Sequence, residues 1–456
     1  MNKIFLLISI TFLISTLTSC SSDDTADTAD TTAPVIAEVT AVTTPNKDST
    51  PDYTFSSDEA GTISYAGSCS SSTTAAVSGN NTITLVALVS GTYTDCTVTV
   101  KDSSGNVSNA ITVTSFSVIE QMGGGFQGAE LSLSTAVTTL AGTGSSGSTN
   151  GTGTAASFNQ PQFITTDGTN LFTPDYSNYS IRKIVISTGV VTTLAGTGSS
   201  GSANGTGTAA SFNGPAGIAT DGTNLYVSED ANHLIRQIVI STGVVTTLAG
   251  TTSTTGSANG TGTAASFSSP QGMATDGTNL FVADMQNHLI RQIVISTGVV
   301  TTLAGTGSSG SANGTGTAAS FNNPVGVETD GTYLYVADFS NELIRKIVIS
   351  TGVVTTLAGT GSSGSTNGTG TAASFNGPAG ISTDGTNLYV ADFNNHMIRK
   401  IIISTGVVTT VAGSTTSGSA NGTGTEASFN QPQGISTDGT KLYLSDRDNH
   451  LIRQID

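Results

Sequence analysis

The feature that most constrains the fold of this chain is an internal repeat. The tract TDGTN, or a close variant, recurs every 54 or 55 residues together with a phrase such as DMQNHLIRQI. A period of this length indicates one small unit of supersecondary structure repeated along the chain. Such a unit cannot bury both of its faces alone, so neighbouring copies must stack to make a core. The aspartates of the tract are Asp167, Asp221, Asp276, Asp330, Asp384 and Asp438.

Each unit is predicted to contain four short β-strands. In the second copy these are AGIAT, NLYVS, LIRQIVI and VVTTLAG. The DG turn between the first two tolerates the positive φ that a tight hairpin needs, and Val, Ile and Thr favour strands. Four antiparallel strands repeated around an axis make a propeller blade. We therefore predict an all-β chain whose residues 132–456 form a β-propeller.

The ends of the repeat predict how the ring closes. Residues 136–142 are a lone fourth strand, and residues 432–455 are a lone set of first, second and third strands. If these two pieces pair, the repeats complete a six-bladed ring that is closed by its N-terminal strand. Closure removes exposed sheet edges, which promote aggregation.

These residues also carry a family resemblance. The phrase NHLIR after a short LYVAD strand resembles the NHL repeat, a family with the β-propeller fold. Propellers with NHL-like or related blades include lyases and lactonases that hold a metal in the central channel. The resemblance therefore implies the fold and leaves open an enzymatic function.

A second domain is predicted over residues 34–118. Short alternating segments such as PDYTFSS, NTITLVALV and CTVTVKD are separated by turn residues, which favours a small β-sandwich. The segment resembles the bacterial Ig-like modules of surface proteins. Its two cysteines, Cys69 and Cys96, are expected to form a disulfide in an oxidising compartment. Residues 119–131, IEQMGGGFQGAEL, are predicted to be a linker.

The first residues predict export. Residues 1–19 have a short basic start and an apolar core, which is the layout of a signal peptide. The sequence LTSC resembles the bacterial lipobox, and the resemblance implies a lipid on Cys20. It also implies the outer membrane or cell surface, because Ser21 stands where Asp marks inner-membrane retention. Residues 20–33 are predicted to be a disordered tether.

The charge of the chain excludes one class of partner. The formal net charge is -17, and no run of basic residues occurs. Attraction to nucleic acid or to anionic lipid headgroups is therefore not expected. Contact with a membrane is expected through the lipid anchor only.

The candidate binding face carries the long glycine-rich loops and the D-x-x-N-H turns, because function sits on loops held by a rigid scaffold. An acid ends each second strand. These carboxylates can hold Ca²⁺, or they can accept backbone N–H bonds and pair with the arginine seven residues later. The acids are Asp175, Glu229, Asp284, Asp338, Asp392 and Asp446.

Four of the same turns carry a histidine. Zinc needs two or three of these rings to converge, whereas one ring per blade is expected to leave them apart. Tyr179 and Glu342 replace histidine in the other two copies, which fits a structural role. No metal site is predicted from them. The histidines are His233, His288, His396 and His450.

The repetition favours binding over catalysis. Catalysis needs different residues that meet at one point, whereas near-identical blades suit repeated weak contacts. We expect a cell-envelope lipoprotein whose propeller is a binding or scaffold module for an extracytoplasmic protein or glycan, with no catalytic residues and no required cofactor. A metal-dependent lyase or lactonase and a purely structural envelope protein are the alternatives. The oligomeric state and the ligand stay open.

Overall fold

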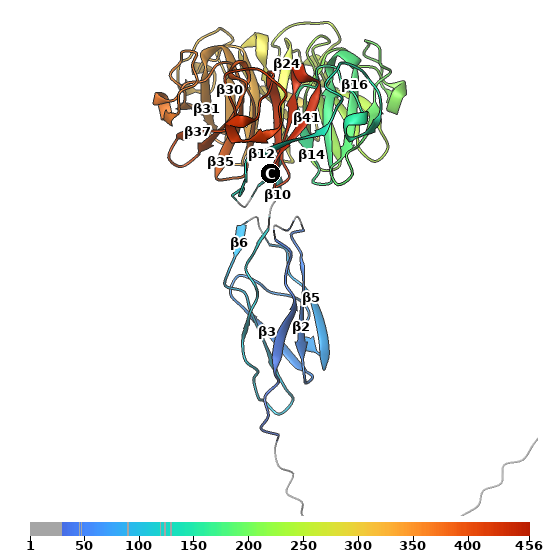
Figure 1. The fold of residues 1–456 in the computed structure, drawn as a ribbon, viewed down its shortest axis with the longest axis vertical. Helices are drawn as coiled ribbons and strands as arrows, with labels where there is room; N and C mark the ends of the chain where they lie inside the picture. Colours follow the sequence, from blue (N-terminus) through green and yellow to red (C-terminus); the bar gives the residue numbers. More distant parts are fainter. Residues whose placement is uncertain are drawn as a thin grey trace, which may run out of the picture.

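The computed structural model describes residues 30–44, 46, 48–88, 91–118, 120–122, 125–127 and 130–456. The predicted signal peptide, Cys20 and most of the predicted tether lie outside the described residues. Figure 1 shows an elongated N-terminal unit and a disc of sheets that contains the repeats. Within the described part of the chain, no helix is long and apolar enough to cross a membrane.

The N-terminal unit is built from short antiparallel strands around one core. One sheet has the order β1-β2-β5, a second has the order β4-β3-β7-β8, and β6 pairs with β9. Tyr53 and Phe55 on β2 and Val98 and Val100 on β7 are buried in the shared core, as expected for strands with one buried face. The strands are β1 (Ile36–Thr40), β2 (Asp52–Ser57), β3 (Gly61–Ala66), β4 (Ala75–Ala76), β5 (Gly79–Thr84), β6 (Gly91–Tyr93), β7 (Thr97–Lys101), β8 (Ile111–Thr112) and β9 (Phe116–Val118).

The predicted disulfide between Cys69 and Cys96 is present. Both residues are buried in the core of the N-terminal unit. They are separated by 27 residues in the sequence. A crosslink over a loop of this length typically adds about 3 kcal/mol to the free energy of unfolding.

The repeats form six five-stranded antiparallel sheets, numbered here as blades 1 to 6 in chain order. From outer to inner edge, blade 1 contains β13 (Gly151–Thr152), β17 (Val190–Ala195), β16 (Ser180–Val185), β15 (Asn170–Asp175) and β14 (Thr165–Thr166). Blade 2 contains β18 (Gly205–Thr206), β22 (Val244–Ala249), β21 (Leu234–Val239), β20 (Asn224–Glu229) and β19 (Pro215–Thr220). Blade 3 contains β23 (Gly260–Thr261), β27 (Val299–Ala304), β26 (Leu289–Val294), β25 (Asn279–Asp284) and β24 (Pro270–Thr275).

The remaining blades repeat this plan. Blade 4 contains β28 (Gly314–Thr315), β32 (Val353–Ala358), β31 (Leu343–Val348), β30 (Tyr333–Asp338) and β29 (Pro324–Thr329). Blade 5 contains β33 (Gly368–Thr369), β37 (Val407–Gly413), β36 (Met397–Ile402), β35 (Asn387–Asp392) and β34 (Pro378–Thr383). Blade 6 contains β38 (Gly422–Thr423), β12 (Ala136–Ala141), β41 (Leu451–Ile455), β40 (Leu442–Asp446) and β39 (Pro432–Thr437).

Short 3₁₀ turns interrupt two of the connections. One kind follows the outermost strand, and the other lies in the D-x-x-N turn of blades 1 and 3 to 6. The first kind comprises η1 (Gly153–Ala155), η3 (Gly207–Ala209), η4 (Gly262–Ala264), η6 (Gly316–Ala318), η8 (Gly370–Ala372) and η10 (Gly424–Glu426). The second comprises η2 (Tyr176–Asn178), η5 (Met285–Asn287), η7 (Phe339–Asn341), η9 (Phe393–Asn395) and η11 (Arg447–Asn449).

The fifth strand of each blade was not predicted from the sequence. It comes from the NGT part of the glycine-rich loop, which pairs with the fourth strand of the following blade, as in Gly205 opposite Val245. The prediction of four strands was wrong because a single Gly-Thr pair carries no strand signal of its own. Each glycine-rich loop therefore leaves one blade and adds a short strand to the outer edge of the next.

The first repeat strand closes the ring in the predicted manner. β12 pairs with β41 through Val137 opposite Ile455 and Thr138 opposite Gln454, and β38 covers its other edge. The inner strands also contact one another from β14 round to β39 and back to β14. Val137 and Ile455 are buried between the sheets. Pairing of β12 with β41 therefore buries apolar side chains in addition to forming hydrogen bonds.

The chain reaches the ring on the side of the TDG turns. The backbone N–H of Leu131 donates to Asp384 Oδ2 at 3.1 Å, and Glu130 forms an ion pair with Lys400 at 3.1 Å. The predicted linker also contains a hairpin of β10 (Glu120–Met122) and β11 (Gly125–Gln127). The D-x-x-N-H turns occupy the opposite side of the ring.

Closure predicts a specific crosslink. Because Thr138 and Gln454 face each other across the β12–β41 pair, the variant Thr138→Cys/Gln454→Cys is expected to form a second disulfide on oxidation. Peptide mass spectrometry detects it. Thr138→Cys/Gln292→Cys is the matched control, because Gln292 holds the equivalent place in blade 3 and pairs with Thr301. An equal yield of crosslink in both variants would contradict this closure.

Candidate functional site

The acids at the ends of the second strands are buried inside the blades. Each one forms an ion pair with the arginine seven residues later, and both side chains are 0% exposed. The arrangement matches the structural alternative considered for these acids, and not an open ring of carboxylates. The arginines are Arg182, Arg236, Arg291, Arg345, Arg399 and Arg453.

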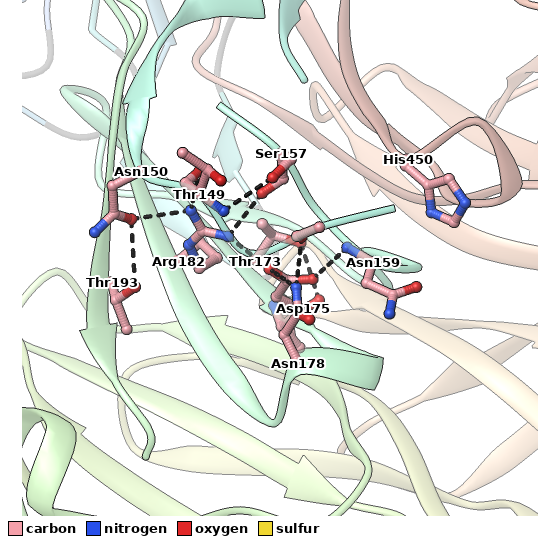
Figure 2. A network of polar contacts seen from close by, with 12 residues as sticks. Thr149, Asn150, Ser157, Asn159, Thr173, Asp175, Asn178, Arg182, Thr193 and His450 are labelled. Atoms are coloured by element: carbon pink, nitrogen blue, oxygen red, sulfur yellow. Dashed lines mark hydrogen bonds and ion pairs between the residues drawn. The ribbon is translucent and has the colours of Figure 1, made fainter. Parts of the chain in front are cut away.

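Blade 1 shows how the arginine is held (Figure 2). Arg182 Nη1 donates to Asp175 Oδ2 at 2.6 Å and to the carbonyl of Ser157 at 2.9 Å. Its Nη2 donates to the carbonyl of Thr149 at 3.0 Å and to Asn150 Oδ1 at 2.9 Å. The guanidinium therefore fixes the middle and the C-terminal end of the glycine-rich loop to the blade.

The carboxylate is also fully bonded. Asp175 Oδ1 accepts the backbone N–H of Asn159 at 2.7 Å, and Oδ2 accepts Nδ2 of Asn178 at 2.8 Å. Asn178 donates in turn to the carbonyl of Gly147 at 2.7 Å. The repeated D-x-x-N spacing thus serves one network, because the acid and the asparagine meet within the same turn.

Burial sets the electrostatics of these carboxyls. It raises the pKa of each acid, while hydrogen bonds and the arginine oppose the rise. For Asp446 the pKa is raised to about 6, so the group is ionised at neutral pH. An aromatic ring adds support, because each guanidinium lies over a phenylalanine, as Arg182 does over Phe158 at 5.1 Å.

The oxygens of the acids considered as possible Ca²⁺ ligands are therefore occupied by protein groups. Within the described ranges, the three carboxylates close enough to share a cation are Asp30, Glu59 and Asp102 of the N-terminal unit. None of the six acids at the ends of the second strands belongs to that group. The arrangement gives those acids no free oxygen for a metal.

Each histidine connects one blade to the next. Nδ1 of His288 accepts the backbone N–H of Asn323 at 3.1 Å. Glu342 does the same in blade 4, where its Oε2 accepts the N–H of Gly377 at 2.5 Å. The other three contacts run from Ser269 to His233, from Gln431 to His396 and from Gln160 to His450, each at 3.1 Å.

Sequence differences between blades gather at the mouth of the central channel. Two of the positions that vary between blades are the residue after each buried acid and the residue after the proline that precedes or opens each inner strand. The first set is Tyr176, Asp230, Met285, Phe339, Phe393 and Arg447. The second set is Gln162, Ala216, Gln271, Val325, Ala379 and Gln433.

These two sets line a cavity of about 300 Å³ on the side of the D-x-x-N-H turns. All twelve residues except Ala216 contribute to its wall, together with Asn323 and Ser340. We call this cavity the mouth pocket. A concave site with apolar walls and a few convergent polar groups is the usual form of a small-molecule site.

Phe163 packs against two residues of the pocket wall near the axis. In the other five blades this position is a glycine whose added Cβ would meet a neighbouring inner strand; at Gly326, for example, the carbonyl of Ala379 lies too close for any side chain. Phe163 instead extends across the axis, where its ring lies 3.0 Å from an ideal Cβ on Gly272 of blade 3. It packs in one cluster with Val325 and Ala379.

The sequence reasoning did not identify the mouth pocket. The signal in the sequence is position-by-position variation between aligned copies, which marks Tyr176, Asp230 and Arg447. The predicted acids and histidines lie behind the pocket and hold its turns in place.

Comparisons with known proteins agree with this fold. The LVIVD repeat family matches residues 325–348. NHL repeat-containing protein 2 of Homo sapiens is 28% identical over 291 residues, which is 56% of this chain and 40% of that protein. Protein SUPPRESSOR OF QUENCHING 1 of Arabidopsis thaliana is 29% identical over 271 residues, which is 55% of this chain and 26% of that protein. The comparisons support an NHL-type propeller.

Two solved structures resemble nearly the whole chain. A structural genomics protein of unknown function from Bacteroides thetaiotaomicron superposes with a TM-score of 0.56 at 17% identity, covering 93% of this chain and 98% of that one. An auxiliary nutrient binding protein from the same organism superposes with a TM-score of 0.54 at 16% identity and the same coverage. At these identities the likeness shows the fold alone. The chain spans less than half the length of the curated relatives named above.

The buried ion pair predicts a large stability effect. Arg291→Met leaves Asp284 buried without its cation, so the free energy of unfolding is expected to fall by about 3–5 kcal/mol. Chemical denaturation measures the change. The double variant Asp284→Leu/Arg291→Met removes both charges and should recover most of the loss. A single variant that loses less than about 1 kcal/mol would contradict the role given to the pair.

The histidine contacts predict a loss of stability in acid. Burial lowers the pKa of His233, His288 and His396 below the ordinary value of 6.5, so the unfolded chain binds these protons more readily. The stability that depends on neutral rings is complete above pH 6.5 and is lost as the pH falls through the lowered values. Replacing all three by Gln keeps an acceptor that does not titrate. The Tm of the wild type should therefore fall relative to that variant between pH 7.5 and 5, and parallel curves would refute the effect.

Proposed function

We propose that this chain is a cell-envelope lipoprotein whose propeller binds a small extracytoplasmic molecule in the mouth pocket. The observation that carries the proposal is the concentration of blade-to-blade differences around that pocket. The next position of each D-x-x-N turn also varies, but only Ser340 of that set lines the pocket. Different side chains around one concave site give six similar blades one asymmetric set of contacts, which a specific ligand requires.

This proposal differs from the expectation from the sequence, which was an extracytoplasmic protein or glycan partner. The acids and histidines expected on the binding face are committed to ion pairs and to contacts between blades, so six equivalent weak sites have no free groups. The pocket supplies one site at the axis instead. Its size suits a small molecule or the end of a larger one. The auxiliary nutrient binding protein of similar fold fits a binding function of this kind.

The remaining parts of the chain fit a tethered binder. We infer that the N-terminal unit is an Ig-like spacer, since its strands, shared core and disulfide have the form of a small sandwich. The TDG side of the ring receives the chain, which turns the mouth pocket away from the anchor. A lipid on Cys20 would hold the protein at the outer membrane or cell surface.

The mouth pocket predicts selective retention of small molecules. Equilibrium dialysis of the protein against a small-molecule extract of culture medium, followed by mass spectrometry, should show bound compounds. The variant Phe339→Ala/Phe393→Ala/Arg447→Ala should lose them, because it removes three walls of the pocket. Gln286→Ala/Asn394→Ala alters exposed residues of the same turns and should retain them. Equal retention by both variants, or none by the wild type, would overturn the binding function.

The anchor predicts a second result. Cells grown with a labelled fatty acid should incorporate the label into the wild-type protein, and Cys20→Ala should abolish incorporation because no other residue takes the lipid in this motif. Protease treatment of intact cells then tests which side of the envelope the propeller faces. Label on the Cys20→Ala variant, or no label on the wild type, would exclude the lipoprotein assignment.

A further inference from the structure

The mouth pocket is divided into an apolar half and a polar half. Its apolar wall comes from blades 3 to 5, and its polar wall comes mostly from blades 6, 1 and 2. The apolar residues are Met285, Val325, Phe339, Ala379 and Phe393. The polar residues of that wall are Gln162, Tyr176, Asp230, Gln271, Gln433 and Arg447, and Asn323 and Ser340 add two polar side chains on the side of blade 4. A ligand that fits this wall has an apolar end and a polar end.

Asp230 places a negative charge in the polar half. Its carboxylate accepts Tyr176 Oη at 3.2 Å and Gln271 Nε2 at 3.3 Å, and no basic side chain is paired with it among the described residues. Burial raises the pKa of Asp230, and the two hydrogen bonds oppose the rise. A half-buried carboxylate with neutral donors only is stabilised by a cationic donor.

Arg447 places a positive charge on the other side of Tyr176. Its guanidinium lies 5.7 Å from the centre of the Phe393 ring. Its polar contacts are long, at 3.4 Å to Gln431 Oε1 and 3.8 Å to Asp448 Oδ1. The guanidinium therefore retains most of its capacity to bind a carboxylate, the group that it pairs with best.

Gln433 supplies an independent sign of a missing partner. The residue is 8% exposed and lines the mouth pocket, yet its Oε1 is buried without a hydrogen bond. Leaving a buried acceptor unpaired costs about 1–3 kcal/mol. A donor on a ligand in the polar half removes that cost.

These groups exclude simpler ligands. A hydrocarbon would leave Gln433 Oε1 unpaired and would remove water from both charges, which is costly. An uncharged sugar would cover Asp230 and Arg447 without neutralising either of them. One ligand that carries both an ammonium and a carboxylate matches all three polar groups and still offers an apolar side chain to Phe339 and Met285.

We propose that the mouth pocket binds a small zwitterion with an apolar side chain, a hydrophobic amino acid or short peptide. The inference rests on the proposed function of the same pocket. The ammonium group donates to Asp230 and Gln433 Oε1, and the carboxylate accepts from Arg447. The side chain packs on the apolar wall of blades 3 to 5.

Isothermal titration calorimetry of the full-length protein tests the ligand class. The probes are L-leucine, L-phenylalanine and L-leucyl-L-leucine, so that free amino acids and a peptide are compared. The matched analogues are 4-methylpentanoate and 3-phenylpropanoate, which lack the amine, and isoamylamine and 2-phenylethylamine, which lack the carboxylate. Glucose and maltose are the uncharged probes. At least one zwitterion should bind about tenfold or more tightly than both of its analogues, the gain expected from one charge-assisted hydrogen bond.

Two variants assign the contacts. Asp230→Asn should weaken zwitterion binding about tenfold or more and leave binding of the carboxylate analogues unchanged. Arg447→Met should weaken zwitterion binding similarly and leave binding of the amine analogues unchanged. Asn394→Ala, on an exposed neighbour of Phe393, is the control that should bind as the wild type does. The Tm of each variant verifies folding, and either charge variant alone is sufficient for the test.

Three results would overturn this ligand class: zwitterions that bind no better than their analogues, preferential binding of a sugar, or no binding by any probe. In each case the dialysis experiment separates the two proposals. Compounds retained by the wild type and lost from the Phe339→Ala/Phe393→Ala/Arg447→Ala variant would preserve the binding function while the zwitterion is excluded. Without such compounds, the binding function fails as well.

Discussion

The buried arginine–carboxylate pair is the interaction on which the rest of each blade depends. Removing two charges from water is costly, and their attraction repays the cost only if the remaining lone pairs and protons are also bonded. Asn178 and the backbone N–H of Asn159 satisfy the carboxylate in blade 1, and Asn150 and two carbonyls satisfy the terminal nitrogens of the arginine. The acid, the asparagine of the turn, the asparagine of the NGT tract and the arginine therefore cannot change independently, which explains why one phrase recurs in every copy.

The same network links each blade to the next. By holding the glycine-rich loop, the arginine positions the NGT tract to add an outer strand to the following blade, as β18 does on β22. In blades 2 to 6 the turn that supplies the acid also supplies a histidine or glutamate that accepts a backbone N–H from the next blade, as His288 does from Asn323. A single blade lacks both contacts, so stability is shared around the ring. Pairing of β12 with β41 then covers the edge of β41, which the last repeat cannot cover with a fourth strand of its own.

Because this network fixes the turns, the residues that line the mouth pocket can differ between blades. Residues such as Asp230 and Phe339 follow an acid that is already fixed by its own arginine, so their side chains are not needed for the turn. Six nearly identical blades can therefore present five kinds of side chain around one axis. The asymmetric substitution of Phe163 for glycine places a phenyl ring at that axis, next to residues of the pocket wall. The residues that stabilise every blade and the residues that differ between blades are thus different residues of the same turns.

Local signals in the sequence determined the strands, the turns, the period of the repeat and the partner of β12, because each is set by spacing along the chain or by what is left over at its ends. They also offered the pairing of each acid with the arginine seven residues later, since both lie on neighbouring strands of one hairpin. The fifth strand escaped prediction because Gly205 and Thr206 become a strand only when the edge of β22 is beside them. The mouth pocket was decided by tertiary structure alone. Tyr176, Asp230 and Arg447 lie far apart in the sequence, and only the closure of the ring brings their turns to one axis, where burial and charge can act on a ligand together.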